Sequence, residues 1–177
     1  MRTVILCAME KEAQYINCPP NIEVIQTGIG LCHTVNTLAL KLATGQLKLT
    51  DRIINVGYAG SNQYDVGDII GINKVQRLCP SATVPETVYN LDAFCPKAML
   101  QVTNIDHCYT ADDFCNEIIK PIPAVDMELY YIKAMGFENV TAFKIISDNL
   151  NYCGYEKFEA EESWKKLNFI LGDVIDE

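Results

Sequence analysis

Three carboxylates stand just past apolar, strand-like runs of this sequence. Glu12 comes soon after the first apolar run of the chain, and Glu128 and Asp148 each follow a later one. In an α/β protein, residues that follow the strands gather at the edge of the sheet where ligands bind. Packing explains acids at that edge poorly, whereas a polar ligand that needs a hydrogen-bond acceptor and a proton donor explains them well. The sequence therefore predicts one site that draws carboxylates from three distant segments.

Each of these acids also has a simpler explanation. Glu12 and Glu128 would be favoured in the first turn of a helix by the helix dipole. Asp148 could cap the backbone at a helix start. The two histidines, His33 and His107, have no serine or cysteine partner that would indicate a catalytic triad. Taken singly, the acids leave both explanations open.

Composition narrows the class of protein. The chain has 177 residues, 49% of them hydrophobic, which is enough for one domain with its own core. Its formal net charge of −9 argues against binding a nucleic-acid backbone, because phosphate contacts need a basic face. No apolar run is long enough to span a bilayer or to serve as a secretory signal. We therefore expect a cytoplasmic protein whose ligand is a small molecule.

The eight cysteines do not indicate a disulfide framework or a metal site. No CxxC pair occurs, and the spacings fit no zinc module. Cys7, Cys32 and Cys108 fall on predicted strands or helices, where cysteine usually packs as a small hydrophobe. Buried free thiols and no bound metal are the expectation.

Short apolar runs alternate with helical patterns along the chain. This alternation predicts an α/β fold with a largely parallel, twisted sheet and helices on both faces. The sequence contains no linker or repeat, so a single domain over residues 1–177 is expected. Residues 78–96 are expected to be irregular because they contain Pro80, Pro85 and Pro96. Strands are expected over 3–8, 22–27, 53–56, 67–72, 99–102, 106–109 and 141–146, and helices from Leu31, from near Met127 and over 155–171.

Two glycine-containing segments follow predicted strands. Thr27–Gly30 opens a helix, but position 33 is His33, so the spacing is not that of a dinucleotide-binding motif. For this segment and for Gly57–Gly60, a tight turn is the first explanation and a shelf for a ligand the second. Asp68 is expected to organise a turn.

Considered together, several motifs favour a functional explanation of these residues over a purely structural one. They resemble those of the 5′-methylthioadenosine/S-adenosylhomocysteine nucleosidases, within the wider purine nucleoside phosphorylase family, and the resemblance extends from Met9 to Phe158. The motifs are Ala8–Glu12, Thr27–Gly30, Asn55–Gly60 with Val66–Ile69, Thr110–Phe114, Val125–Glu128 and Ile146–Asp148.

The resemblance implies roles for the acids. Asp148, oriented by Ser147, would protonate N7 of the departing purine, which requires a carboxyl whose pKa is held up by burial or neighbouring charge. Glu128 would accept hydrogen bonds from the ribose 2′- and 3′-hydroxyls, with Met127 packed against the sugar. Glu12 would orient and deprotonate the attacking water, so that an acid and a base serve opposite sides of the sugar.

The resemblance also implies the rest of the binding site. Phe114 would stack on the base, and the backbone of Cys115 would contact its edge. Ile29 and Phe158 would lie near the 5′ substituent. A homodimer without metal or cofactor is implied as well. The other expected substrate-binding residues are Met9, Tyr58, Ala59 and Gly60.

Two positions depart from the family pattern. Such nucleosidases usually have a serine at the position of Tyr58 and an arginine at that of Lys144, and both positions help to hold the attacking water. Lysine keeps the charge of arginine but loses its planar fork of donors. The chain is also shorter than is usual, between Glu12 and Ile22 and between Asn73 and Met99. The reaction class is therefore better defined than the substrate.

Water is favoured over phosphate as the nucleophile. A phosphorylase usually holds phosphate with arginine. Arg2 and Arg52 precede their strands, at the end of the sheet opposite the site, and Arg77 lies in the irregular region. Two alternatives stay open: a phosphorylase, and a nucleoside-binding protein without turnover, for which Tyr58 is the best support.

Overall fold

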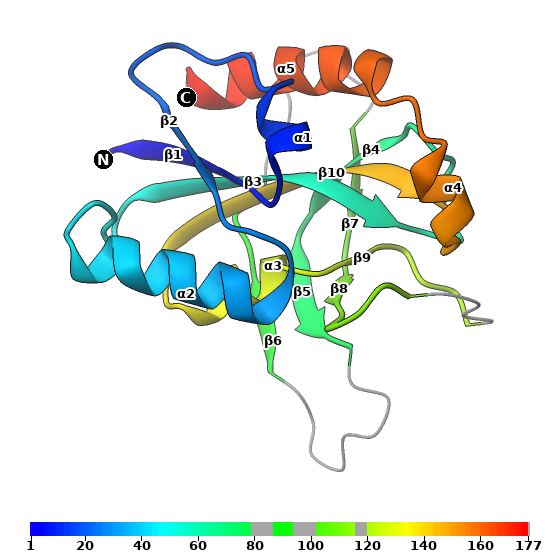
Figure 1. Ribbon diagram of the computed structural model, residues 1–177, viewed down its shortest axis with the longest axis horizontal. Helices are drawn as coiled ribbons and strands as arrows, with labels where there is room; N and C mark the ends of the chain where they lie inside the picture. The colour runs from blue at the N-terminus through cyan, green and yellow to red at the C-terminus, as the bar shows by residue number, and fades with distance from the viewer. Residues whose placement is uncertain (79–86, 94–101, 116–119, 177) are drawn as a thin grey trace.

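The centre of the fold is a group of four parallel strands. The computed structural model describes residues 1–78, 87–93, 102–115 and 120–176. Because all four strands run in one direction, their carboxyl ends meet at the same edge of the sheet (Figure 1). In spatial order the strands are β2 (Glu23–Gln26), β1 (Thr3–Cys7), β3 (Arg52–Gly60) and β10 (Asn139–Asp148).

Shorter strands extend the sheet on both sides of this centre. Among the nine pairings between described strands, six are parallel and three antiparallel, so the sheet is mixed, as the predicted α/β class allows. Beyond β10 lie β4 (Ile69–Ile72) and β7 (Thr103–Ile105). Beyond β3 lie β9 (Val125–Asp126), β8 (Cys108–Thr110), β5 (Lys74–Arg77) and β6 (Val88–Asn90).

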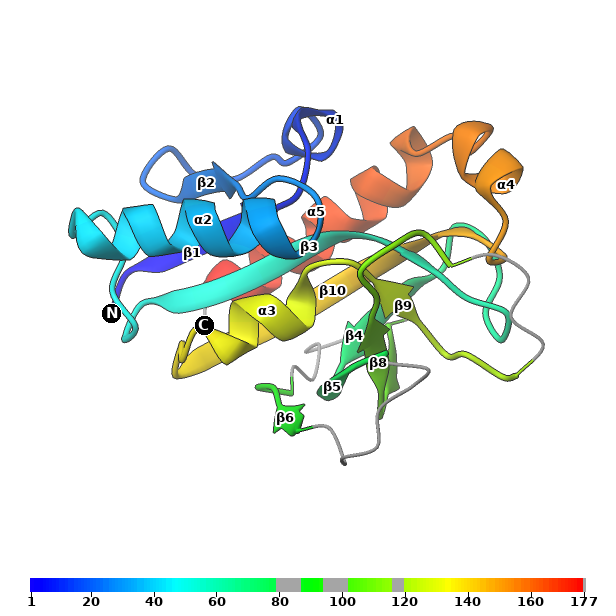
Figure 2. The ribbon, with the colours of Figure 1, turned by 60° about the horizontal axis from the view of Figure 1, so that its bottom comes forward.

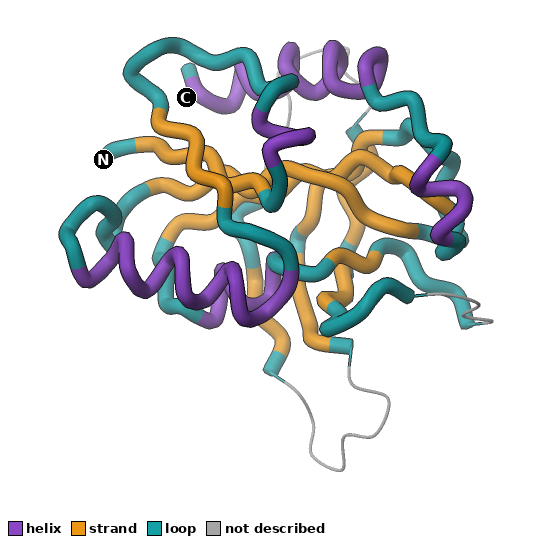
Figure 3. The backbone as a smooth tube through the Cα atoms, in the orientation of Figure 1, coloured by secondary structure: helices purple, strands orange, loops and turns teal. Residues whose placement is uncertain are grey.

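Helices cover both faces of the sheet, as predicted. In Figures 1 and 2, α2 (Gly30–Ala43) and α3 (Leu129–Ala134) lie on one side of the central strands and α5 (Glu161–Ile175) on the other. Two short helices, α1 (Glu10–Ala13) and α4 (Tyr152–Glu156), follow the carboxyl ends of β1 and β10. The layering is also visible in the backbone trace of Figure 3.

The alternation of side chains along β1 explains the two layers. Val4 and Leu6 pack in the hydrophobic cluster that contains residues of α2 and α3. Ile5 and Cys7 point to the opposite face and pack in the cluster that contains Trp164 of α5. The strand is apolar on both faces because it is buried on both.

The turn predicted at Gly57–Gly60 is wrong. β3 continues through this segment and pairs with β10, with Gly57 opposite Lys144 and Ala59 opposite Ile146. Hydrogen bonds with a long neighbouring strand outweigh the local preference of glycine for turns. The backbone at the edge of the site is therefore an extended strand end.

The single helix predicted over 155–171 is also wrong. α4 ends at Glu156 and α5 begins at Glu161. The break lets Phe158 and Trp164 both contact the ring of Tyr58, at centroid distances of 5.6 and 5.9 Å. Six residues apart on one continuous helix, these two side chains would point in different directions.

The region predicted to be irregular, 78–96, contains a strand. β6 forms there because it pairs with β5, with Asn90 opposite Lys74. Pro80, Pro85 and Pro96 lie outside the described residues, and so do residues 99–101 of a predicted strand. Within the described part of the chain, no helix is long and apolar enough to cross a membrane.

Candidate active site

A cavity of about 360 Å³ opens at the edge where the central strands end. Most of the residues expected at a site lie around it, although they come from both ends and the middle of the chain. They are Met9, Glu12, Ile29, Tyr58, Ala59, Gly60, Phe114, Cys115, Met127, Glu128, Ser147 and Asp148. Lys144 and Phe158 are the two expected residues that do not line it.

Glu12 is held by three backbone donors. Its Oε2 accepts hydrogen bonds from the N–H groups of Ala8 (2.7 Å) and Met9 (2.9 Å), and its Oε1 accepts one from the N–H of Tyr58 (3.1 Å). A Cβ at Gly57 would lie 2.6 Å from Oε1, so the absence of a side chain there makes room for the carboxylate. Burial raises the pKa of Glu12, while Lys144 and the three N–H groups oppose the rise. Glu12 therefore has one fixed orientation.

Glu128 lies directly before α3 and points toward the start of α2. Its Oε1 accepts a hydrogen bond from the backbone N–H of Gly30 at 2.9 Å. Burial, followed by repulsion from Asp126, raises the pKa of Glu128 to about 7, although Lys144 and the Gly30 N–H act against both. The pKa is thus close to neutral pH, far above that of an exposed glutamate.

Asp148 is the last residue of β10. Ser147 Oγ donates a hydrogen bond to its Oδ2 at 2.8 Å, and the N–H of Asn151 donates one to its Oδ1 at 3.2 Å. The residue is 2% exposed. Burial raises the pKa of Asp148 in spite of these donors. A carboxyl in this environment retains its proton to higher pH than an exposed aspartate does.

Lys144 lies behind the cavity in a buried ion pair. Its Nζ is 2.7 Å from Oδ2 of Asp126, and both side chains are almost fully buried. Asp126 also accepts hydrogen bonds from Thr110 Oγ1 (2.5 Å) and from the N–H of Leu129 (3.0 Å). Burial alone would lower the pKa of Lys144, but the carboxylates of Asp126 and Glu128 raise it above its ordinary value. The ammonium therefore remains charged between the acids of the site.

Sequence reasoning missed Asp126, which both lines the cavity and pairs with Lys144. It stands two residues before Glu128, at the end of β9. This close spacing was the available signal, since two buried acids so near each other need a cation nearby.

An aromatic wall closes another side of the cavity. The Phe114 ring lies 5.3 Å from that of Tyr152 and 6.0 Å from that of Tyr155, measured between centroids. Cys115 lies next to it in the lining. Tyr152 and Tyr155, from α4, were not expected at the site. The Tyr152 ring packs edge-on at 86° and the Tyr155 ring is tilted at 57°, and the two contacts together fix the Phe114 ring relative to the cavity.

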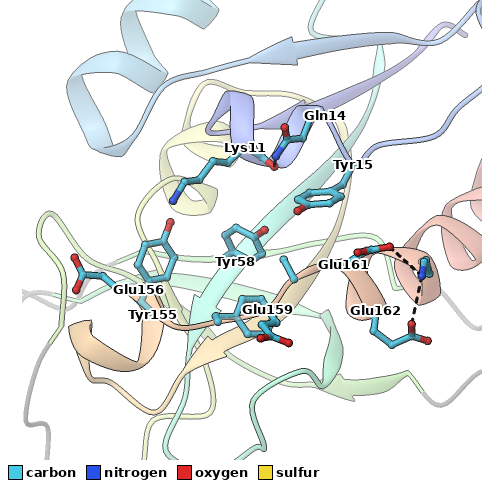
Figure 4. Close-up of a pocket in the computed structure, with 12 residues that line it drawn as sticks. Lys11, Gln14, Tyr15, Tyr58, Tyr155, Glu156, Glu159, Glu161 and Glu162 are labelled. Carbon is cyan, nitrogen blue, oxygen red and sulfur yellow. Dashed lines mark hydrogen bonds and ion pairs between the residues drawn. The ribbon is translucent and has the colours of Figure 1, made fainter.

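Tyr58 also lines a second cavity, of about 580 Å³ (Figure 4). Its hydroxyl accepts a hydrogen bond from Trp164 Nε1 at 2.8 Å. Phe158 lines this second cavity, and three residues, Lys11, Tyr58 and Tyr155, line both. The ring that replaces the expected serine is therefore packed among other aromatic rings.

The arginines make contacts of their own. Arg2 pairs with Glu23, and Arg77 pairs with Asp112 at 2.5 Å. Arg52 begins β3, at the opposite end of that strand from the cavity. None of the three is among the described residues that line either cavity.

The described part of the chain contains no cluster that could hold a metal ion. Nowhere in it do three histidine, cysteine or acidic residues lie close enough together. The six described cysteines are free. Cys7 and Cys108 are buried, as predicted, but Cys32 is exposed, because it lies on the outer side of α2.

Comparison with known proteins gives a likeness of structure. No family model matches the sequence, and no curated protein matches it. The solved structure of Helicobacter pylori 5′-methylthioadenosine/S-adenosylhomocysteine nucleosidase superimposes with a TM-score of 0.73 at 15% identity, over 99% of this chain and 97% of that one. This chain has the nucleosidase fold.

Two further structures give the same result. The Streptococcus pneumoniae nucleosidase, solved with the transition-state inhibitor MT-ImmA, has a TM-score of 0.73 at 17% identity, with 98% of this chain and 100% of that one covered. Futalosine hydrolase of H. pylori has a TM-score of 0.72 at 16% identity, with 99% and 97% covered. At such identities the nucleosidase fold is what the chains share.

Proposed function

We propose that this protein hydrolyses the N-glycosidic bond of a purine nucleoside, with 5′-methylthioadenosine, S-adenosylhomocysteine or a related adenine nucleoside as substrate. The observation that carries the proposal is the meeting of three buried carboxyls, Glu12, Glu128 and Asp148, at one cavity of a nucleosidase fold. The three differ in their hydrogen-bond partners, which suits them to different tasks.

Asp148 is the proposed proton donor. Cleavage of the bond leaves negative charge on the purine, and a proton delivered to N7 neutralises the leaving group. Burial raises the pKa of Asp148, so the carboxyl can hold the proton that it must give. Ser147 Oγ, 2.8 Å from Oδ2, fixes the direction of the carboxyl.

Glu12 is the proposed base for the attacking water. Three backbone N–H groups hold its carboxylate in place. Burial raises the pKa of Glu12, which makes it a stronger base than an exposed glutamate, while Lys144 keeps the charged form accessible. A fixed base of moderate strength suits the removal of a proton from water as the sugar becomes cationic.

Glu128 is the proposed partner of the ribose hydroxyls. One of its oxygens accepts from Gly30 N–H, and the carboxylate has further acceptor capacity for the 2′- and 3′-hydroxyls. Met127 would pack against the sugar, and Phe114 and the Cys115 backbone would contact the base. All of these residues line the cavity.

The charge of the cavity favours water over phosphate. Its described lining holds five acidic residues and one basic residue, Lys11. The arginines that a phosphate site would use are engaged elsewhere or lie at the opposite end of a strand. A phosphate dianion would be repelled at this site, so hydrolysis is the proposed reaction.

The test is release of free base from 5′-methylthioadenosine, S-adenosylhomocysteine, adenosine and inosine, each with and without phosphate. We expect release without phosphate. Asp148→Asn should lower kcat by roughly 10²- to 10⁴-fold and leave ligand binding largely intact. Asp173→Asn, at a residue that lines neither cavity, is the matched control and should behave as wild type.

Three outcomes would contradict the proposal. Release only in the presence of phosphate would make the protein a phosphorylase. Binding without any release would make it a nucleoside-binding protein. Near-normal turnover of Asp148→Asn would remove Asp148 from the role of proton donor.

We further propose that the protein acts as a homodimer in the cytoplasm, on a small-molecule substrate and without nucleic acid. The net charge of −9 supports the last point. Activity on 5′-methylthioadenosine would place it in methionine salvage. Sedimentation velocity tests the dimer, and a monomer at micromolar concentration would contradict it.

A further inference from the structure

The second cavity adjoins the proposed nucleoside site. It measures about 580 Å³, larger than the first, and shares Lys11, Tyr58 and Tyr155 with it. Phe158, the residue expected near the 5′ substituent, lines this second cavity. A 5′ substituent that extends from the nucleoside toward Phe158 would therefore pass the shared residues and enter the second cavity.

Aromatic rings form part of its wall. The Tyr58 ring meets that of Tyr155 at 6.1 Å and 72° and that of Phe158 at 5.6 Å and 86°. Aromatic faces attract cations and also accept apolar chains. Lys11 already places its Nζ 5.9 Å from the centroid of Tyr155. One ring of the wall, that of Tyr155, thus already lies near an ammonium group.

The rim of this cavity is acidic. Figure 4 shows Glu156 beside Tyr155 and Glu159 below Tyr58, with Glu161 and Glu162 on the other side. Those last two share one cation, the ammonium of Lys165, at 3.1 and 3.7 Å.

Two of these acids have no cationic partner among the described residues. In the part of the chain that the structure describes, Glu156 and Glu159 take part in no ion pair. Lys11 and Lys165 are the basic residues of the lining, against four glutamates. The cavity therefore combines aromatic surface with a net negative charge.

We propose that this second cavity takes the 5′ substituent of the nucleoside and selects one with an apolar arm that ends in a positive charge. An arm of three or four methylene-sized atoms would pack on Tyr58 and Phe158, and its ammonium would lie among the glutamates. A neutral arm would gain only the packing, and an arm ending in a carboxylate would be repelled. The inference rests on the proposed function, because it needs a nucleoside in the first cavity.

The experiment compares three adenosine 5′-thioethers of equal reach, with 3-aminopropyl, butyl and 2-carboxyethyl arms. Binding is measured by calorimetry on the Asp148→Asn variant, and kcat/KM for base release on the wild type. We expect the aminopropyl compound to exceed the butyl compound roughly five- to tenfold in both, from one ring contact and two exposed charges. The carboxyethyl compound should be the weakest, and added salt should reduce the differences.

A variant pair tests whether the glutamates cause the preference. In Glu156→Gln/Glu159→Gln the ratio of aminopropyl to butyl affinity should fall toward one. The control, Glu10→Gln/Glu138→Gln, removes the same charge at exposed positions outside the cavity and should keep the ratio. Phe158→Ala should weaken the butyl and aminopropyl compounds alike, since it removes packing surface.

The outcomes separate this inference from the proposed hydrolysis. Equal binding of the three compounds, a preference for the carboxylate, or an unchanged ratio in the Glu156/Glu159 variant would overturn the inference. If base is released from all three at the same rate, the hydrolase proposal stands and this inference fails. If the aminopropyl compound binds best and no base is released, the inference stands and the hydrolase proposal fails.

Discussion

Replacement of Glu128 by glutamine should stabilise the protein at alkaline pH. Glu128 is 7% exposed, and burial together with the nearby charge of Asp126 raises its pKa to about 7. Glutamine has the same shape and can still accept the hydrogen bond from Gly30 N–H, but it has no charge to bury. The variant therefore isolates the cost of ionising Glu128 in the folded protein.

The size of the effect follows from the two pKa values of Glu128. The ordinary value is 4.5, against about 7 in the folded protein. At about 1.36 kcal/mol per pKa unit, this difference corresponds to roughly 3 kcal/mol. Because the folded state binds the proton more tightly than the unfolded state, the protonated form adds stability below pH 4.5. That contribution is lost as the pH rises from 4.5 to about 7.

The assay is denaturation by urea at pH 4.5, 6 and 8, followed by the fluorescence of Trp164, the one tryptophan of the chain. Relative to wild type, Glu128→Gln should gain roughly 3 kcal/mol of unfolding free energy between pH 4.5 and 8. Titrating groups that lie away from Glu128 contribute equally to both proteins and cancel in the difference. Glu138→Gln, at an exposed position, is the control and should show a constant difference from wild type.

A constant difference for Glu128→Gln across this pH range would refute the reasoning. It would mean that Lys144 and the Gly30 N–H offset burial and the charge of Asp126 completely. The same variant should also lose nucleoside affinity, because an amide cannot replace the carboxylate as acceptor of two hydroxyl hydrogen bonds. A stabilised but weakly binding protein is thus the expected result.

Asp126→Asn should destabilise the protein by roughly 3–5 kcal/mol in urea denaturation, because it removes the carboxylate that pairs directly with the buried Lys144 ammonium. A loss under 1 kcal/mol would contradict this. In the wild type, the Ser147 hydroxyl stabilises the charged form of Asp148 and so lowers its pKa. In Ser147→Ala, the alkaline limb of the plot of kcat against pH should therefore move to higher pH. A shift to lower pH would refute that role. Gly60→Ala would place a Cβ 2.9 Å from Oδ1 of Asp148. The displaced carboxyl should reduce kcat roughly tenfold or more. Turnover at the wild-type rate would show that the carboxyl can shift without loss of activity.

Local sequence patterns predicted the central part of the fold well. The runs 3–8, 22–27 and 141–146 became β1, β2 and β10, and the acids Glu12 and Asp148 lie at the carboxyl ends as expected. Such predictions succeed because a buried parallel strand needs a continuous apolar run, and because the residue that follows it must lie at the sheet edge.

Predictions failed where distant contacts outweigh local preference. The glycines at 57 and 60 favour a turn, yet ladder hydrogen bonds with β10 keep the segment extended. The helical pattern over 155–171 contains no proline or glycine stop at the break, and contacts with Tyr58 divide it. The pairing of Lys144 with Asp126 joins residues 18 positions apart, and no local pattern specifies it.

The sequence by itself indicated that Glu12, Glu128 and Asp148 would meet, because the order of strands and helices places the residues after each strand at one edge. The tertiary structure alone decided what each carboxyl can do there. Burial, backbone donors and the charge of Lys144 set the orientation and proton affinity of Glu12, Glu128 and Asp148. These quantities depend on which distant groups pack within a few ångströms, and only the folded chain specifies that.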